Sequence, residues 1–265
     1  MKIVDYLRLI RIPLFILSII ASISIMKYFD TYESLKSLLI LLAIVSGNIS
    51  MNIYNEVFDV ETDKILKPWK PIPSGRINKS EAEKIAMMSL GVSLSLVVVL
   101  GLRHDIIYLL IGLLGIISGI FYNALRYKVF GGNIALGTAY FSAALMCSYP
   151  HDFWFAVAFG LITISFNIAV QVQDIEGDYK AQLKTLPIVV GIFKARVISA
   201  VIGSYAVLIL VNKYYPKTFS VVFSSIIFAI MIALYRNDWK SYEYLVRGLS
   251  RLLMIIGFML MFLGV

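Results

Sequence analysis

Two short acidic segments follow long apolar runs and lie far apart in the chain. The first covers residues 55–63 (NEVFDVETD) and the second residues 174–178 (DIEGD). Each follows about 20 residues that are apolar enough to cross a bilayer. Carboxylates are costly beside hydrocarbon, so acids in such places are expected to have a function. If the two segments face each other at one end of a helical bundle, they form a site for hard cations such as Mg²⁺, which share their coordination shell with phosphate oxygens.

Helical spacing places the polar residues of each segment on one face. In the first segment they recur every three or four positions, and in the second at offsets of 0, 4, 7 and 11. Such stripes inside a membrane must face the bundle interior or an aqueous cavity. The alternative is that the amides link helices and the acids are solvated helix ends, but two matched stripes favour a site. The stripes are Asn48, Asn52, Asn55 or Glu56, Asp59 and Asp63, and then Asn167, Gln171, Asp174 and Asp178.

Basic residues near both segments are candidates for holding phosphate. The loop after the first segment is rich in proline and carries three of them, the loop after the second carries Lys184, and residues 122–128 (YNALRYK) form a third patch. Tyr122 in this patch is a candidate to face the reacting carbon, with an interfacial aromatic anchor as its alternative, and we expect Tyr127 to be such an anchor. For each lysine, a solvated determinant of membrane topology is the alternative. The other basic candidates are Lys67, Lys70, Arg76, Arg126 and Lys128.

The composition predicts an all-α, polytopic membrane protein. Of the 265 residues, 60% are hydrophobic, against about 45–50% apolar residues in a soluble domain. Windows long enough to span a bilayer predict nine transmembrane helices in a single domain, residues 1–265. The nine segments lie near 13–29, 35–57, 82–102, 105–122, 132–150, 153–173, 192–212, 218–235 and 245–264.

The distribution of positive charge predicts the orientation. If all nine segments cross the membrane, 19 of the 24 Lys and Arg lie on the side that holds the N-terminus and both acidic segments. The positive-inside rule then places this side in the cytoplasm. The net charge of +8 does not indicate nucleic acid as a partner, because no polar segment combines a basic run with interleaved aromatics. The five residues on the other side are Lys27, Lys36, Arg103, Lys213 and Lys217.

The motifs resemble the UbiA superfamily of intramembrane prenyltransferases. The resemblance rests on the spacing Asn55-x3-Asp59-x3-Asp63, on KPWKPIPSGR at 67–76 and on DIEGDYKAQLKTLPIVVG at 174–191. It implies nine helices around a central cavity open to lipid, and Mg²⁺-dependent transfer of a prenyl group from a diphosphate donor to a lipophilic acceptor. It also implies that Asp59, Asp63, Asp174 and Asp178, with Asn55, hold metal and diphosphate, that Tyr122 acts in catalysis, and that Lys67, Arg76, Lys128 and Lys184 lie near the phosphates. Family members often have Asp where this chain has Glu56.

Within the superfamily, the sequences of both motifs look most like those of the archaeal digeranylgeranylglyceryl phosphate synthases. This implies transfer of a geranylgeranyl group to the sn-2 hydroxyl of geranylgeranylglyceryl phosphate. A phosphorylated acceptor needs a second phosphate site, for which Arg8, Arg11, Arg247 and Arg251 are candidates, with anchoring by the positive-inside rule as their alternative. An aromatic or quinone-precursor acceptor is the alternative for the reaction. A transporter, which also has polar stripes in the membrane, is the alternative from another class.

Overall fold

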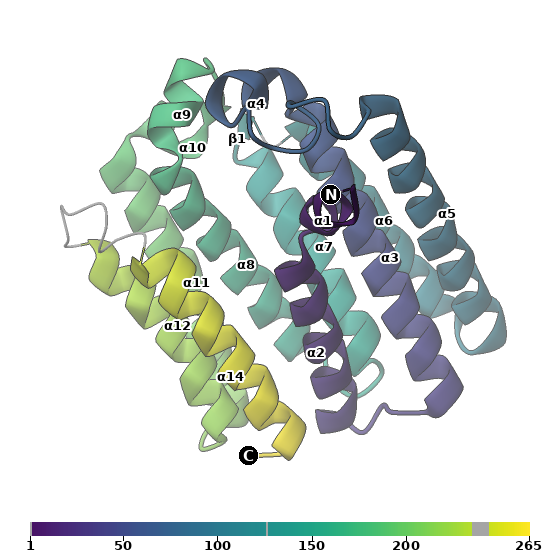
Figure 1. Ribbon diagram of the computed structural model, residues 1–265. Coiled ribbons are helices and arrows are strands. Elements are labelled where there is room, and N and C mark those ends of the chain that lie inside the picture. Colours follow the sequence, from purple (N-terminus) through teal and green to yellow (C-terminus); the bar gives the residue numbers. More distant parts are fainter. Residues whose placement is uncertain (1, 126, 235–243) are drawn as a thin grey trace.

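The chain folds almost entirely into helices. The computed structural model describes residues 2–125, 127–234 and 244–265. Nine long helices form its body (Figure 1). They are α2 (Ile12–Tyr28), α3 (Ser34–Phe58), α5 (Lys79–Arg103), α6 (Ile106–Leu125), α7 (Gly131–Ser148), α8 (Trp154–Gln173), α11 (Ile192–Tyr214), α12 (Thr218–Leu234) and α14 (Ser250–Leu263), the last preceded by the π-helical turn η1 (Tyr244–Leu249).

Short elements gather at one end of this body. They are α1 (Lys2–Ile10), α4 (Val60–Leu66), α9 (Ile175–Lys180) and α10 (Leu186–Val190), with the two-residue strands β1 (Lys128–Val129) and β2 (Lys184–Thr185). Figure 1 shows α4, β1, α9 and α10 together at the upper end, whereas the C-terminus lies at the lower end. Both acidic segments therefore lie at the same end of the molecule.

The long helices form a closed ring. Each packs against the next one in the sequence, and α14 packs against α2, so that the last helix meets the first. Successive helices run in opposite directions (Figure 1). Many large apolar side chains on their outer faces are exposed, as expected for surfaces that contact lipid. The ring explains how one cavity can be lined by residues from both ends of the chain.

The fold is that of a polytopic membrane protein, as the sequence predicts. Each of the nine predicted segments coincides with a long helix to within a few residues. Within the described residues, six of these helices are long and apolar enough to span a bilayer, and α1 with α2 makes a seventh if the pair, bent by 52°, is one span. Helix α7 is not among them, and the described apolar part of α12, Thr218–Ile227, is too short to cross by itself. The number of nine membrane crossings therefore stays a prediction.

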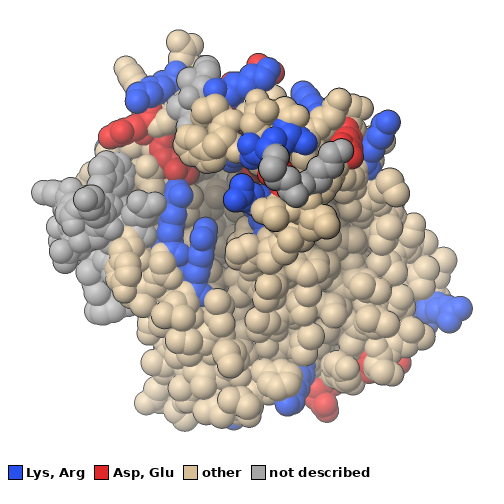
Figure 2. All heavy atoms as spheres, viewed as in Figure 1, with Lys and Arg blue, Asp and Glu red and all other residues tan. Residues whose placement is uncertain are grey.

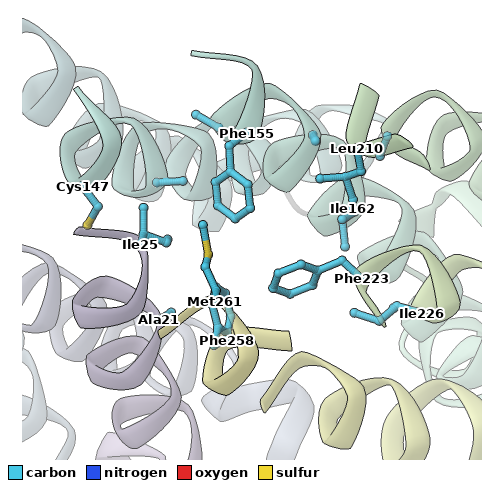
Figure 3. Close-up of a cluster of buried hydrophobic side chains, with 14 of the residues drawn as sticks. Ala21, Ile25, Cys147, Phe155, Ile162, Leu210, Phe223, Ile226, Phe258 and Met261 are labelled. Carbon is cyan, nitrogen blue, oxygen red and sulfur yellow. The ribbon is translucent and has the colours of Figure 1, made fainter. Parts of the chain in front are cut away.

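Aromatic side chains fill the end of the bundle away from the acidic segments. The Phe223 and Phe258 rings lie 5.0 Å apart between α12 and α14, and Phe159 from α8 lies 5.6 Å from Phe258. Figure 3 shows Phe155, Phe223, Phe258 and Met261 pointing toward one another. Edge-to-face pairs of this kind add to the stabilisation gained from burial. The cluster closes the bundle at this end and leaves the cavity nearer to the acidic segments.

Helices α7 and α8 approach each other through glycine. A β-carbon at Gly160 would lie 3.0 Å from the carbonyl oxygen of Gly137 and 3.0 Å from Phe141 Cβ. We expect Gly160→Ala to destabilise the protein by about 1–3 kcal/mol, because backbone must move to admit the methyl group. Gly91→Ala is the matched control, since nothing lies within 4 Å of a β-carbon there. Thermal unfolding in detergent should show a lower Tm for Gly160→Ala alone, and equal Tm values would contradict the close packing.

Candidate active site

The two acidic segments share one local design. Helix α3 ends at Phe58 and Asp59 occupies the break before α4, while α8 ends at Gln173 and Asp174 occupies the break before α9. Helical hydrogen bonding continues through each break, with Asp63 N–H donating to the Asp59 carbonyl at 2.7 Å and Asp178 N–H to the Asp174 carbonyl at 2.9 Å. Each pair of aspartates is therefore separated by one helical turn, at the same end of the bundle.

Basic side chains neutralise the buried acids of the first segment. Glu56 and Asp63 are 6% and 4% exposed. Lys70 Nζ bridges them, at 2.9 Å from Glu56 Oε2 and 2.6 Å from Asp63 Oδ2, and Arg11 Nη2 lies 2.6 Å from Glu56 Oε1. Burial raises the pKa of the Asp63 carboxyl group, and Lys70 opposes this shift. The Glu56 and Asp63 carboxylates therefore form a buried site that binds one positive charge between them.

Arg11 is held in an unusual backbone conformation. Its φ and ψ of 57° and 62° lie in the left-handed region, between α1 and α2. For a residue other than glycine, this backbone conformation is strained. It is found where the surrounding structure holds the residue in place. Pro13 follows in the first turn of α2, where its missing N–H costs little. The turn aims the Arg11 side chain at Glu56 from the first helix of the ring.

Tyr127 links the third patch to the first acidic segment. Its hydroxyl donates to Asp59 Oδ1. The interpretation of Tyr127 as an interfacial anchor alone is therefore incomplete, and this residue belongs among the candidates that the sequence missed. The spacing of residues 122–128 could not predict this contact, because Tyr127 and Asp59 are 68 positions apart in the sequence.

The second acidic segment is bound by an arginine from the turn that precedes the last helix. Arg247 Nη2 lies 2.6 Å from Asp174 Oδ1, and Arg247 Nε donates to Gln173 Oε1. Arg247 lies on the π-helical turn η1, and such turns are frequent at functional sites. Asp178 is partly buried in the next turn. The contact of η1 with α8 thus brings a guanidinium from the C-terminal part of the chain to the second acidic segment.

A short parallel strand pair joins the loops that carry two predicted phosphate ligands. Lys128 of β1 lies opposite Lys184 of β2, and Val129 opposite Thr185. Both lysine side chains are exposed. The pair places these lysines side by side, although 56 positions separate them in the sequence.

Other predicted phosphate ligands have different surroundings. Arg76 donates to Asp5 Oδ1 at 3.0 Å and to the Trp69 carbonyl at 2.6 Å, so it fixes the loop to α1. Lys67 and Arg8 are exposed. Arg126 lies outside the described residues.

A cavity of about 350 Å³ opens below the acidic segments. Its walls are mostly apolar and come from α2, α3, α5, α6, α7, α8 and α14. In Figure 2 the surface is hollowed below the upper end of the molecule, and Lys and Arg side chains border the hollow. Its polar lining includes Asn48, Asn52, Asn55, Tyr122, Asn123 and Asn167, together with Arg11 and Arg251.

The second polar stripe is divided between cavity and helix interface. Asn167 lines the cavity and donates to Asn133 Oδ1 at 2.7 Å, and Asn133 donates to Gln171 Oε1 at 3.3 Å. Asn133 is fully buried between α7 and α8. Gln171 therefore belongs to an interhelical amide network, as the structural alternative for these amides predicts. Asn133 was missed because it lies alone at the start of α7, with no polar partner at helical spacing.

Comparison with known proteins identifies the family. The profile of the UbiA prenyltransferase family matches residues 15–262. The chain belongs to the UbiA prenyltransferase family. It is 31% identical over 253 residues to digeranylgeranylglyceryl phosphate synthase from Saccharolobus solfataricus, covering 89% of this chain and 84% of the relative, and 31% identical over 198 residues to the synthase from Methanosphaera stadtmanae, covering 73% and 70%.

Solved structures share the fold of this UbiA-family prenyltransferase. One, of digeranylgeranylglyceryl phosphate synthase, is 23% identical with a TM-score of 0.72, covering 99% of this chain and 98% of the other. Another, a UbiA homolog from Archaeoglobus fulgidus bound to GPP and Mg²⁺, is 20% identical with a TM-score of 0.70, covering 97% and 99%. At these identities the likeness extends to the fold.

The donor atoms of this UbiA-family site suit a hard cation. Among the described residues, no three acidic, histidine or cysteine side chains lie close enough to enclose a metal ion by themselves. The small number of carboxylates agrees with the usual coordination of Mg²⁺. This ion binds one or two carboxylates and completes its coordination shell with phosphate oxygens and water. The ammonium group of Lys70 between Glu56 and Asp63 shows that these carboxylates accept a shared cation. The residues therefore fit a metal whose remaining ligands come from substrate.

Proposed function

We propose that this protein transfers a geranylgeranyl group from geranylgeranyl diphosphate to the sn-2 hydroxyl of geranylgeranylglyceryl phosphate. The observation that carries the proposal is the placement of two acidic segments at one end of a bundle, above a mostly apolar cavity. A diphosphate needs cations and a prenyl chain needs an apolar space, and this site offers both next to each other. Family membership and relatives that are named digeranylgeranylglyceryl phosphate synthase support the reaction.

Mg²⁺ is the proposed cofactor. Asp59, Asp63, Asp174 and Asp178, with Asn55 and Glu56, would hold it together with the diphosphate, and a UbiA homolog has been solved with GPP and Mg²⁺. When bound, the metal supplies electrophilic stabilisation of the charge that develops on the leaving diphosphate. Lys70, Arg11 and Arg247 are bound to carboxylates in the described structure. They are close enough to the acids to contact phosphate once these acids have another cation partner.

The transfer exchanges one carbon–oxygen bond for another. The bond from the allylic C1 to the diphosphate oxygen breaks, and diphosphate leaves with the electron pair. The sn-2 oxygen then bonds to C1 and loses its proton, giving an ether. Tyr122 lines the cavity below the acids, where its ring can face the electron-poor carbon. A carboxylate of the site or the released diphosphate takes the proton, and a strong base is not required because C1 already carries positive charge.

The proposed orientation has the N-terminus and the acidic segments in the cytoplasm. The charge asymmetry of the loops supports it, since only five of the 24 Lys and Arg fall on the other side if all nine segments cross the membrane. Figure 2 shows Lys and Arg concentrated at the end that carries α4 and α9. The site would then face a soluble pool of Mg²⁺ and of phosphorylated precursors.

The acceptor is tested by direct competition between chemical classes. We expect membranes containing the protein to transfer radiolabelled geranylgeranyl to geranylgeranylglyceryl phosphate and to leave 4-hydroxybenzoate unmodified. Separation of the labelled products by chromatography provides the measurement. Membranes without the protein give the background. Product from 4-hydroxybenzoate alone would favour the aromatic acceptor, and uptake of substrate without any product would favour the transporter.

A further inference from the structure

The cavity carries a positive charge that no nearby acid balances. Among the described residues that line it, two are cationic, Arg11 and Arg251, and none is a carboxylate. Arg11 is bound to Glu56 at 2.6 Å. Arg251 makes no hydrogen bond and no ion pair with any residue in the described ranges. The Arg251 side chain lines the cavity and is exposed, so its charge is open to an anion that enters the cavity.

The charged neighbours of Arg251 also favour binding of an anion. The charged groups that act on it are two further guanidiniums, Arg247 and Arg11. Both of these are engaged by the acidic segments, Arg247 with Asp174 and Arg11 with Glu56. Arg251 has no such partner among the described residues, so an anion beside it would be attracted by its unpaired charge and by its two cationic neighbours.

The position of Arg251 separates it from the donor's diphosphate. It lies four residues after Arg247, so it is about 6 Å farther along the helix, toward the middle of the bundle. Arg247 marks the level of Asp174, where the diphosphate is proposed to bind. Arg251 therefore faces the cavity rather than the acidic segments, on the wall formed by α14 beside α2.

We propose that Arg251 binds the phosphate monoester of the acceptor lipid and sets the preference for a phosphorylated acceptor. The inference rests on the proposed function and adds a residue and its role. Guanidinium matches phosphate oxygens in a two-pronged arrangement that an ammonium group cannot reproduce. With its phosphate held by Arg251 inside the cavity mouth, the glycerol backbone of the acceptor is anchored close to the allylic carbon of the donor.

The test compares a phosphorylated with an unphosphorylated acceptor. In Arg251→Met we expect the kcat/KM ratio of geranylgeranylglyceryl phosphate over geranylgeranylglycerol to fall about 10- to 100-fold, as for the loss of a charge-assisted contact. The KM for geranylgeranyl diphosphate should change little. Arg251→Lys should recover part of the preference. Lys84→Met removes an exposed positive charge at the same end of the protein and is the matched control.

A binding measurement supports the kinetic one. Without donor, geranylgeranylglyceryl phosphate should raise the Tm of the wild-type protein and of Lys84→Met, and it should raise the Tm of Arg251→Met much less. An unchanged acceptor ratio in Arg251→Met, or an equal rise in the KM for the donor, would overturn the assignment while leaving the proposed reaction intact. A wild-type protein that uses neither glycerol ether would overturn the proposed reaction itself, and this assignment with it.

Discussion

Asp59→Asn and Asp174→Asn should each lower turnover by about 100- to 10,000-fold while the protein stays folded. The reason is that each aspartate occupies the break at the end of a long helix, four residues after Asn55 or Val170, which line the cavity. The substitution keeps the size of the side chain and removes the charge that holds a cation. Loss of metal-assisted departure of diphosphate costs several kcal/mol, and about 1.4 kcal/mol corresponds to a tenfold change in rate. Steady-state prenyl-transfer rates of purified variants give the measurement.

Matched controls exist within the same segments. Glu61 and Glu176 are exposed, and Glu61 is paired only with Lys64 three residues away among the described residues. Glu61→Gln and Glu176→Gln should therefore retain most of the activity, because exposed pairs of this kind contribute little. Unchanged activity in both Asp59→Asn and Asp174→Asn, with unchanged Tm values, would contradict the proposed metal site.

Removal of divalent cations should reduce transfer to background. We expect EDTA to abolish product formation and added Mg²⁺ to restore it, because the leaving diphosphate then has no divalent counter-charge. Monovalent Lys70 and Arg247 cannot replace the metal, since both are bound to the acids that would otherwise hold it. Radiolabelled product formed with EDTA, with EDTA and excess Mg²⁺, and with neither gives the measurement.

The same ion pairs predict that metal and diphosphate stabilise the protein together. Mg²⁺ alone must displace Lys70 from Glu56 and Asp63 and leave the lysine without a partner. Diphosphate alone meets carboxylates that repel it. Thermal unfolding with Mg²⁺, with inorganic diphosphate and with both should therefore show a Tm increase for the pair that exceeds the sum of the two single increases. Full activity in EDTA, or a Tm that responds to neither ligand nor to both, would contradict this account.

The sequence predicted the parts of this protein that depend on local pattern. The lengths of the apolar runs predicted the long helices, and the spacing of the acids predicted one helical turn between Asp59 and Asp63 and between Asp174 and Asp178. Both signals arise within about 20 residues. The motif resemblance predicted the family, and the family profile confirmed it.

Contacts between distant segments were beyond that pattern. The pairing of Lys128 with Lys184 depends on two residues in each strand, too few to leave a periodic signal. The bridge of Lys70 between Glu56 and Asp63 depends on how the proline-rich loop folds back over α4. Gln171 looked like part of a site because its spacing is helical, but the residue that binds it, Asn133, lies on another helix. In each case the energy comes from a partner that the local sequence does not contain.

The contact between α2 and α14 has a consequence for biosynthesis. Because α2 and α14 share a seam, the wall around the cavity is incomplete until α14 has been synthesised and inserted. Until then, the amide groups of α3 and α8 and the guanidinium of Arg11 have an open side toward lipid, which is unfavourable for polar groups. The ring can therefore close only when α14 inserts beside α2, which precedes it by more than 200 residues.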